Sequence, residues 1–128
     1  MRALVLQAIV ANPTITALIP AGRWIQAGSL DEMPVRPFAV IRLVDGTQTV
    51  VYSEQPRFEI WVHDDRGSYI KIDQILRLVR ETLVASVPLE DSNSRIVDIE
   101  WTGNGPDLVD EGYNTNARTA RFTLTGRK

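Results

Sequence analysis

A strictly alternating segment followed at once by a long amphipathic one constrains the fold of this chain most. In the segment Arg57–His63, one face is apolar and carries Phe58, Ile60 and Val62. The opposite face is polar or aromatic and carries Arg57, Glu59, Trp61 and His63. Successive residues of a strand point to opposite faces of its sheet, so the pattern predicts a strand with one face in the core.

The next segment, Ser68–Val87, repeats its apolar residues at helical spacing. They form one stripe, made of Tyr69, Ile72, Ile75, Leu76, Val79, Leu83 and Val87. A charged ladder at i, i+4 spacing lies opposite, made of Asp73, Arg77 and Glu81. We predict a helix that is capped by Ser68, lies with its stripe on a sheet and ends at Pro88. Three aliphatic residues lie off the stripe, either as scattered exposed side chains or as part of a subunit contact: Ile70, Leu78 and Val84.

The N-terminal segment Ala3–Ala11 is apolar nearly all round, which predicts a helix held between other elements and ended by Asn12-Pro13. With Met1-Arg2 it imitates a secretory signal. Gln7 interrupts the apolar run, however, and no small-residue cleavage pattern follows, so we expect a core helix. Shorter pieces come next: a turn at Thr14–Ile19, an extended segment at Arg23–Gln26 and a loop at Ala27–Pro37.

Two more segments before the helix predict strands. Phe38–Val44 is apolar and rich in β-branched residues, which is typical of a buried strand. Asp45-Gly46 then predicts a hairpin turn, with Thr47–Tyr52 as the returning strand.

The C-terminal third predicts two strands separated by a long glycine-rich loop, Thr102–Thr115. In Arg95–Trp101 the alternation assigns Val97, Ile99 and Trp101 to the buried face, and Asp98 and Glu100 to the other. In Ala117–Thr125 it turns Ala120, Phe122 and Leu124 inward, and Thr119, Arg121 and Thr123 outward.

Composition is that of one globular domain spanning residues 1–128. Hydrophobic residues make up 44% and charged residues 23% of the chain, far from the signature of disorder. We therefore predict an α+β fold with a curved, largely antiparallel sheet of about four to five strands and two helices packed on it. A net charge of -2 argues against binding by phosphate neutralisation. The absence of cysteine excludes disulfides, thiolate zinc sites and cysteine nucleophiles, and no apolar run is long enough to cross a membrane.

Catalytic patterns are weak throughout. His63-Asp64-Asp65 contains the only histidine, but adjacent strand residues point to opposite faces, so we expect a polar strand end and no metal site. Gly103-Asn104-Gly105-Pro106 lacks the lysine of a phosphate-binding loop, and no serine lies in a nucleophile elbow. The sequence thus predicts no enzyme, no metal and no cofactor.

The three tryptophans are candidate interface residues, because tryptophan is enriched at the centres of protein interfaces. Core packing accounts for Trp101, while Trp24 lies in a short extended segment. Trp61 lies on the polar face of its strand, so either loops of the same chain or another subunit must cover it.

The order of these segments resembles the tail terminator, or tail completion, proteins of long-tailed bacteriophages (siphophages). The resemblance covers most of the chain and is carried by Ala3–Ala11 with Asn12-Pro13, Ala17–Pro20, Arg23–Ile25, Pro37–Ile41 and Arg57–Val62 running into Ser68–Val87. It rests on element order and residue type.

The resemblance implies a virion protein, assembled in the host cytoplasm, that forms a hexameric ring on the last ring of the tail tube. Such a ring stops tube polymerisation, offers a docking face to the head connector and lets DNA pass through its lumen without specific binding. Under this hypothesis the subunit interface consists of Arg57, Glu59, Trp61 and His63. The loops Asp45–Gln55 and Thr102–Thr115 would contact the tail tube and the connector, through Asp45, Gln48, Asp107, Asp110 and Glu111.

Three alternatives stay open from the sequence. Another head-to-tail joining or neck protein would share the small α+β format and lack a catalytic site. A small-ligand binding module would need a concave apolar pocket beside the sheet. A metal-dependent hydrolase would need more ligands than the lone histidine and its neighbours supply.

Overall fold

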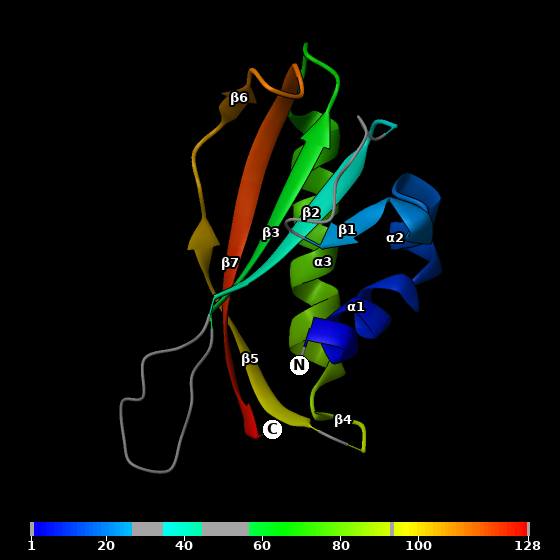
Figure 1. The fold of residues 1–128 in the computed structure, drawn as a ribbon, viewed down its shortest axis with the longest axis vertical. Coiled ribbons are helices and arrows are strands. Elements are labelled where there is room, and N and C mark those ends of the chain that lie inside the picture. Colours follow the sequence, from blue (N-terminus) through cyan, green and yellow to red (C-terminus); the bar gives the residue numbers. More distant parts are fainter. Residues whose placement is uncertain (1, 27–34, 45–56, 93, 128) are drawn as a thin grey trace.

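The computed structural model describes residues 2–26, 35–44, 57–92 and 94–127 (Figure 1). Its helices are α1 (Arg2–Val10), α2 (Pro13–Leu18) and α3 (Ile70–Ser86), with a short 3-10 turn η1 at Ala21–Arg23. Its strands are β1 (Trp24–Gln26), β2 (Phe38–Val44), β3 (Arg57–Asp64), β4 (Leu89–Glu90), β5 (Arg95–Asn104), β6 (Leu108–Asp110) and β7 (Thr115–Arg127). None of the helices described is long and apolar enough to span a membrane.

One curved sheet organises the molecule. Its strand order is β1-β2-β3-β7-β5-β4, and β6 pairs with β7 beside this path. Only the pairing of β1 with β2 is parallel among the described strands. The α+β class and the largely antiparallel sheet are therefore confirmed. The expected four to five strands approximate the seven in this sheet. Strand β1 falls within the predicted extended segment Arg23–Gln26, whereas β4 and β6 are too short to show a period of two.

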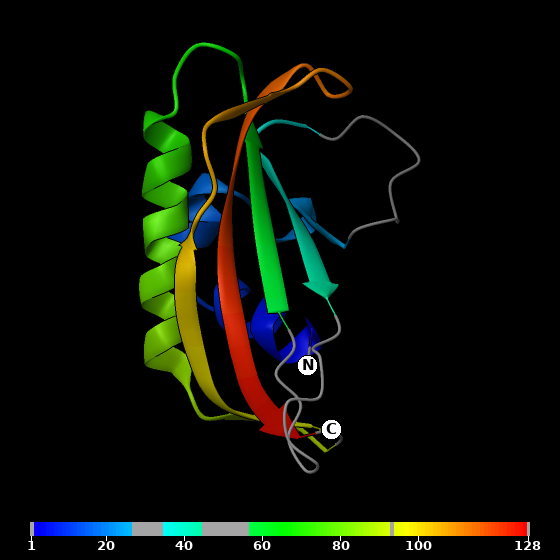
Figure 2. The same ribbon diagram turned by 90° about the vertical axis from the view of Figure 1, so that its left-hand side faces the viewer.

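Helix α3 covers one face of the sheet, over β3, β7 and β5, as Figure 2 shows from the side. The predicted stripe of this helix is buried there, with five residues fully or almost fully enclosed: Ile72, Ile75, Leu76, Val79 and Leu83. They meet the inner side chains of the sheet, among them Phe58, Ile60, Val62, Phe122 and Leu124. Burial of this apolar surface is the main force that holds helix and sheet together.

Helix α1 packs against α3, and a second N-terminal helix, α2, follows it directly. The sequence predicts only a turn in this place. Asn12 explains the difference, because its Oδ1 accepts a hydrogen bond from Thr14 N at 2.9 Å and so caps α2. The Asn12 amide also donates to Thr82 Oγ1 of α3 at 2.8 Å. One side chain thus starts α2 and ties it to the central helix.

The start of α3 differs slightly from the predicted one. The helix begins at Ile70, and Tyr69 occupies the cap position without a capping hydrogen bond from its side chain. Ser68 Oγ still accepts a hydrogen bond from Ile70 N at 3.1 Å, so it satisfies one of the free amides at this helix end.

The buried face of β5 was assigned wrongly at its start. Ile96 is fully buried and Val97 is 46% exposed, the reverse of the prediction for Val97. A register shift between Ile96 and Asp98 relative to β7 is the reason. A bulge inserts one residue into a strand and inverts the alternation on one side of it. Ile99 then returns to the inner face opposite Leu124.

Part of the predicted loop Thr102–Thr115 consists of strands. Strand β5 continues to Asn104. Strand β6 follows, and after a tight turn at residues 111–114 the chain returns as β7, whose first part pairs with β6. Thr119 points outward as predicted, beside Trp61, but it is fully buried, since Gly105 packs over it and Gly105 N donates to Thr119 O at 2.8 Å. The loop prediction was wrong for the residues in these strands because it relied on the turn-forming residues Gly103, Gly105, Pro106 and Gly112. The Asp45-Gly46 turn, the strand Thr47–Tyr52 and most of the loop before Pro37 lie outside the described residues.

Candidate functional site

The sheet face opposite α3, called the outer face below, carries a charged row across three neighbouring strands. Arg42 of β2, Glu59 of β3 and Arg121 of β7 lie directly opposite one another. Such cross-strand neighbours interact through their side chains, and opposite charges attract. Arg121 Nε lies 3.8 Å from Glu59 Oε2, and the Arg121 side chain remains 52% exposed. The row therefore holds a glutamate between two guanidinium groups.

A hollow of about 530 Å³ opens over this row and over the row next to it, where Arg57 faces Thr123. The arginine face, as we call it, is formed by Arg42, Arg57, Glu59, Thr102, Arg121 and Thr123. Three guanidinium groups against one carboxylate give it a net charge of +2. Arg57 and Glu59 belong to the predicted interface set, whereas Arg42 and Arg121 were not predicted as site residues. The register of three strands that are far apart in sequence brings them together.

Trp61 lies one row further along the outer face, between Val40 and Thr119. The Trp61 side chain is half-buried, so its own chain covers part of the indole and leaves part accessible. Cover by a second subunit stays a prediction for the accessible part. An accessible part of a tryptophan beside the arginine face is the kind of surface that a partner protein covers.

His63 was expected on the exposed outer face, but it is only 4% exposed. Its ring stacks on Phe38 with centroids 4.6 Å apart and meets the edge of Tyr113 at 5.3 Å. The His63 Nδ1 lies 2.8 Å from Thr115 Oγ1. Burial lowers the pKa of His63, and the nearby charge of Asp110 partly opposes this effect. The chain itself thus covers His63, through the turn between β6 and β7.

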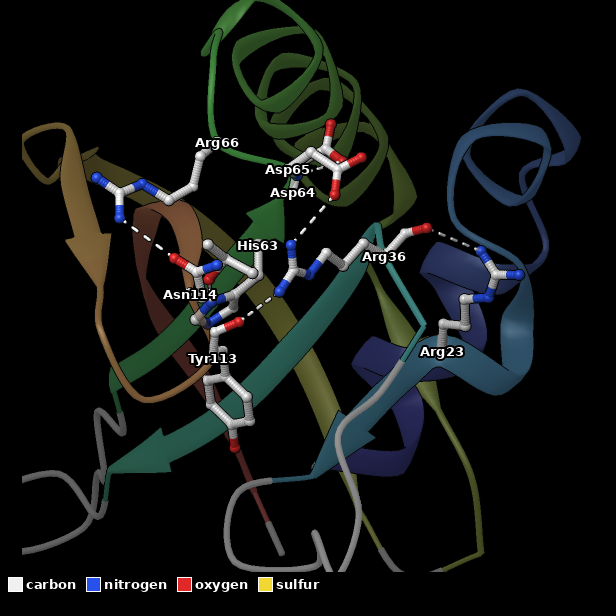
Figure 3. Close-up of polar contacts among 9 residues, drawn as sticks. Arg23, Arg36, His63, Asp64, Asp65, Arg66, Tyr113 and Asn114 are labelled. Atoms are coloured by element: carbon white, nitrogen blue, oxygen red, sulfur yellow. Dashed lines mark hydrogen bonds and ion pairs between the residues drawn. The ribbon is translucent and has the colours of Figure 1, made fainter.

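Polar contacts hold this end of the sheet together, as Figure 3 shows. Arg36 lies at the centre of them: one nitrogen of its guanidinium lies 3.2 Å from Asp65 Oδ1, and another donates to Tyr113 O at 2.7 Å. Arg66 donates to Asn114 Oδ1 at 3.2 Å. These contacts join three segments distant in sequence: the residues before β2, the β3–α3 connection and the β6–β7 turn. The end of the molecule is therefore cross-linked by hydrogen bonds.

The predicted contact residues of the C-terminal segment lie at or near this end. Asp107 lies 3.7 Å from Arg118 Nε, and Asp110 Oδ1 accepts a hydrogen bond from Tyr113 N at 3.0 Å. Both carboxylates thus stabilise their own subunit, while Glu111 is exposed at the turn. Asp45 and Gln48 lie outside the described residues.

Several aliphatic side chains are exposed. Ile70, at 80% exposure, is the first residue of α3 and follows Tyr69, whose Oη donates to Leu108 O of β6 at 2.6 Å. Val84 of α3 and Val97 of β5 are each 46% exposed. Ile70 and Val84 are two of the residues that the sequence placed off the helix stripe, while Leu78 is half-buried against the core.

A groove of about 480 Å³ lies between α3 and β5. We call it the edge groove, and it is lined by Arg80, Glu81, Val84, Ala85, Asp98, Ile99, Glu100 and Trp101. The guanidinium of Arg80 lies 3.7 Å above the ring of Trp101, a cation–π contact. The sequence did not predict this groove. Its one sign in the sequence is Val84, an aliphatic residue off the predicted apolar stripe of α3.

The cluster His63-Asp64-Asp65 does not converge. His63 turns to the outer face, Asp64 follows it in the alternation of β3, and Asp65 pairs with Arg36. Among the described residues, no three His, Cys, Asp or Glu side chains lie close enough to hold a metal ion. The arrangement offers charged and apolar surfaces for contact with another macromolecule.

Two solved structures share this fold over nearly the whole chain. A protein in the virion of a native gene transfer agent particle superposes with a TM-score of 0.75 at 16% identity, over 100% of this chain and 95% of its own. The chain has the fold of that virion protein. A second solved structure, which carries no functional description, superposes with a TM-score of 0.70 at 9% identity, over 99% and 93% of the two chains. No protein-family model matches the sequence, and no curated protein matches it either.

Proposed function

We propose that this chain is a structural protein of a phage or phage-like virion, which caps the tail tube as a hexameric ring. In this role it stops tube polymerisation and provides the docking surface for the head connector. The observation that carries the proposal is the superposition with a gene transfer agent virion protein over nearly the full length of both chains. The order of elements, which resembles tail terminator proteins, supports the finer assignment.

The surfaces of the subunit suit such a role. A ring requires a heterologous contact, in which two different surfaces of one subunit meet its two neighbours. Arg57, Glu59 and Trp61 lie on an outer face that no helix of the described chain covers. His63 lies on the same face, but its own chain buries it, so in this proposal it stabilises the face and does not touch the neighbouring subunit.

The cross-linked end of the molecule suits contact along the tail axis. Its turn carries Glu111, and the nearby ends of α3 and β6 carry the exposed aliphatic residues Ile70 and Leu108. A rigid end with exposed apolar side chains can bind a tube or connector protein with little loss of conformational entropy. In this proposal DNA passes through the lumen without specific binding, and no residue of the chain performs bond chemistry.

Tail length measures the proposed activity. In particles that lack this chain, we expect tails of uncontrolled length that do not join heads, and supply of the wild-type chain should restore both. A His63→Gln variant that assembles normal tails would further support a role without catalysis. Tails of normal length in the absence of the chain would contradict tail termination.

A neck protein on the head side of the joint is the second candidate, because the fold match names a virion and no position within it. The same experiment separates the two. Loss of a neck protein should leave tails of normal length that fail to attach to heads. Loss of a terminator should lengthen the tails themselves.

A further inference from the structure

The edge of the sheet at β5 is open over most of its length. Strand β5 pairs with β7 on one side, and on the other side it pairs with β4 only at Arg95 and Ile96. Along 97–104 no described strand covers this edge, which faces the viewer beside α3 in Figure 2. Backbone groups at an open edge are free to bond to another chain, so natural proteins shield such edges or use them for association.

The inner side of this edge is the edge groove, which is mainly apolar. Ile99 and Trp101 of β5 point toward α3 and line the groove together with Val84 of that helix. Ile99 is almost fully buried, whereas Val84 is 46% exposed. Two charged residues of α3 also line the groove, and their charges balance: Arg80, whose guanidinium lies over the Trp101 ring, and Glu81. The groove can therefore receive apolar side chains from a strand that lies along β5.

The outer side of the same edge is acidic. Asp98 and Glu100 point to the outer face, where their partners on β7 are the uncharged Thr125 and Thr123. Both acidic residues are exposed, and no ion pair among the described residues involves either carboxylate. Arg57 lies in the row of Glu100, but on β3, with Thr123 of β7 between them. Side chains directly opposite each other on neighbouring strands interact, so the open position beside β5 favours basic side chains on its outer side.

Strand β4 already shows this pattern in the part of the edge that it covers. Its Leu89 lies opposite the buried Ile96 and packs against the core. Its Glu90 lies opposite Arg95, so opposite charges face each other on the exposed side. The edge thus pairs apolar residues on its inner side and complementary charges on its outer side. A strand that continues the track of β4 along 97–104 would extend both rows.

We infer that this edge binds an extended segment of another protein, in which apolar and basic side chains alternate. The segment would pair with 97–104 as an added strand, with its apolar side chains in the edge groove and its basic ones opposite Asp98 and Glu100. A second copy of this chain fits less well, because β1, at the other end of the described sheet, carries no basic residue. The inference goes beyond the proposed function, since it names a class of ligand and requires no ring.

A synthetic peptide tests this edge in the full chain. The probe alternates valine and lysine over the length of 97–104 and has blocked termini, and fluorescence anisotropy measures its Kd. It should bind about ten-fold or more tightly than an alternating valine–glutamate peptide, or than one with the same valines and lysines in two blocks. Glu100→Lys should weaken its binding by about ten-fold. Glu111→Lys, the same charge change at an exposed position in the β6–β7 turn, is the matched control and should bind as wild type.

Methylation of the peptide backbone separates strand addition from attraction of charge alone. Successive residues of a strand direct their N–H groups to opposite edges, so methylation of alternate nitrogens blocks one edge of the peptide and leaves the other free. Two probes, methylated at the valines or at the lysines, keep the same side chains. One of them should lose binding to the wild-type chain, and the other should retain it.

Several results would overturn the inference: no binding of the alternating probe, equal affinity for the block peptide, or binding that survives both patterns of methylation. An oligomer of the free chain that Glu100→Lys dissociates would also overturn it, because a second copy would then occupy the edge. None of these outcomes concerns tail length. Tails of normal length in particles without the chain would contradict only the proposed function.

Discussion

A buried imidazole fixes the turn between β6 and β7 to the sheet. His63 forms a cluster of three rings in mutual contact with Phe38 and Tyr113, and its Nδ1 is within hydrogen-bond distance of Thr115. Burial disfavours the charged form, so the folded state holds this ring neutral. Protonation of His63 should therefore weaken the packing of the turn that carries Glu111 against the sheet.

Stability should therefore fall in mildly acidic solution. The pKa of His63 lies below its ordinary value of 6.5 in the folded chain, so below that pH the unfolded chain binds the proton more readily. The unfolding free energy should decline by at most about 1.4 kcal/mol per pH unit as pH falls through 6.5. It should level off once the pH is below the pKa of His63 in the folded chain. Denaturant titrations of wild type and His63→Gln across this range measure the difference. An equal pH dependence in both proteins would show that His63 is not the responsible group.

Gly105 packs closely against Thr119 on the outer face of the sheet. A Cβ at this position would lie 2.6 Å from Thr119 Cγ2, closer than two carbon atoms can approach. We expect Gly105→Ala to lower the unfolding free energy by about 1–3 kcal/mol, as overpacked sites do. In a Thr119→Ser background, which lacks that methyl group, the same substitution should cost clearly less. A cost that is unchanged by Thr119→Ser would mean that the contact is not the cause.

At the scale of the element, the bulge in β5 decides which side chains reach the core. Ile96 is fully buried and Val97 is half-exposed, contrary to simple alternation. Ile96→Ala should therefore cost about 2–5 kcal/mol, and Val97→Ala less than about 0.5 kcal/mol. Denaturant unfolding of the two variants, under salt conditions that keep the chain monomeric, measures both. Equal costs would contradict the bulge.

Long periodic elements could be predicted from the sequence, and short or irregular ones could not. Strands β2 and β3 and helix α3 each present an apolar pattern over seven or more residues, and their bounds were predicted to within two residues. Strands of two or three residues such as β4 and β6 show no period at all. The bulge in β5 is also invisible in the sequence, since it depends on how that strand pairs with β7.

The same limit applies to the site. Arg57, Glu59 and Trp61 could be assigned to the outer face because they alternate within one strand. Arg42 and Arg121 join them only through the pairing of β2 and β7 with β3, which the sequence does not reveal. His63 also follows the alternation of β3. Its burial could not be predicted, because the β6–β7 turn that covers it lies in a segment for which the sequence predicts a loop. Site residues that lie within one element could thus be predicted, whereas those that depend on contacts between elements could not.

At the scale of the whole molecule, Trp61 separates assembly from folding. Part of its side chain is accessible on the outer face, and truncation of tryptophans at interfaces is often costly for binding. Trp61→Ala should weaken subunit association, or binding to tail tubes, by about ten-fold or more, because its accessible surface is covered only in the assembly. The thermal transition of the isolated subunit should remain cooperative and shift little.

Trp24 provides the matched control for this prediction. It is buried, and its indole Nε1 donates to Ile19 O at 3.0 Å. Trp24→Ala should therefore lower the unfolding free energy by about 3–5 kcal/mol and affect assembly only through the loss of folded subunit. Sedimentation and thermal unfolding of both variants, side by side, give the comparison. If Trp61→Ala destabilises the subunit as much as Trp24→Ala does, Trp61 belongs to the core, and the outer face must bind its neighbour through the arginines alone.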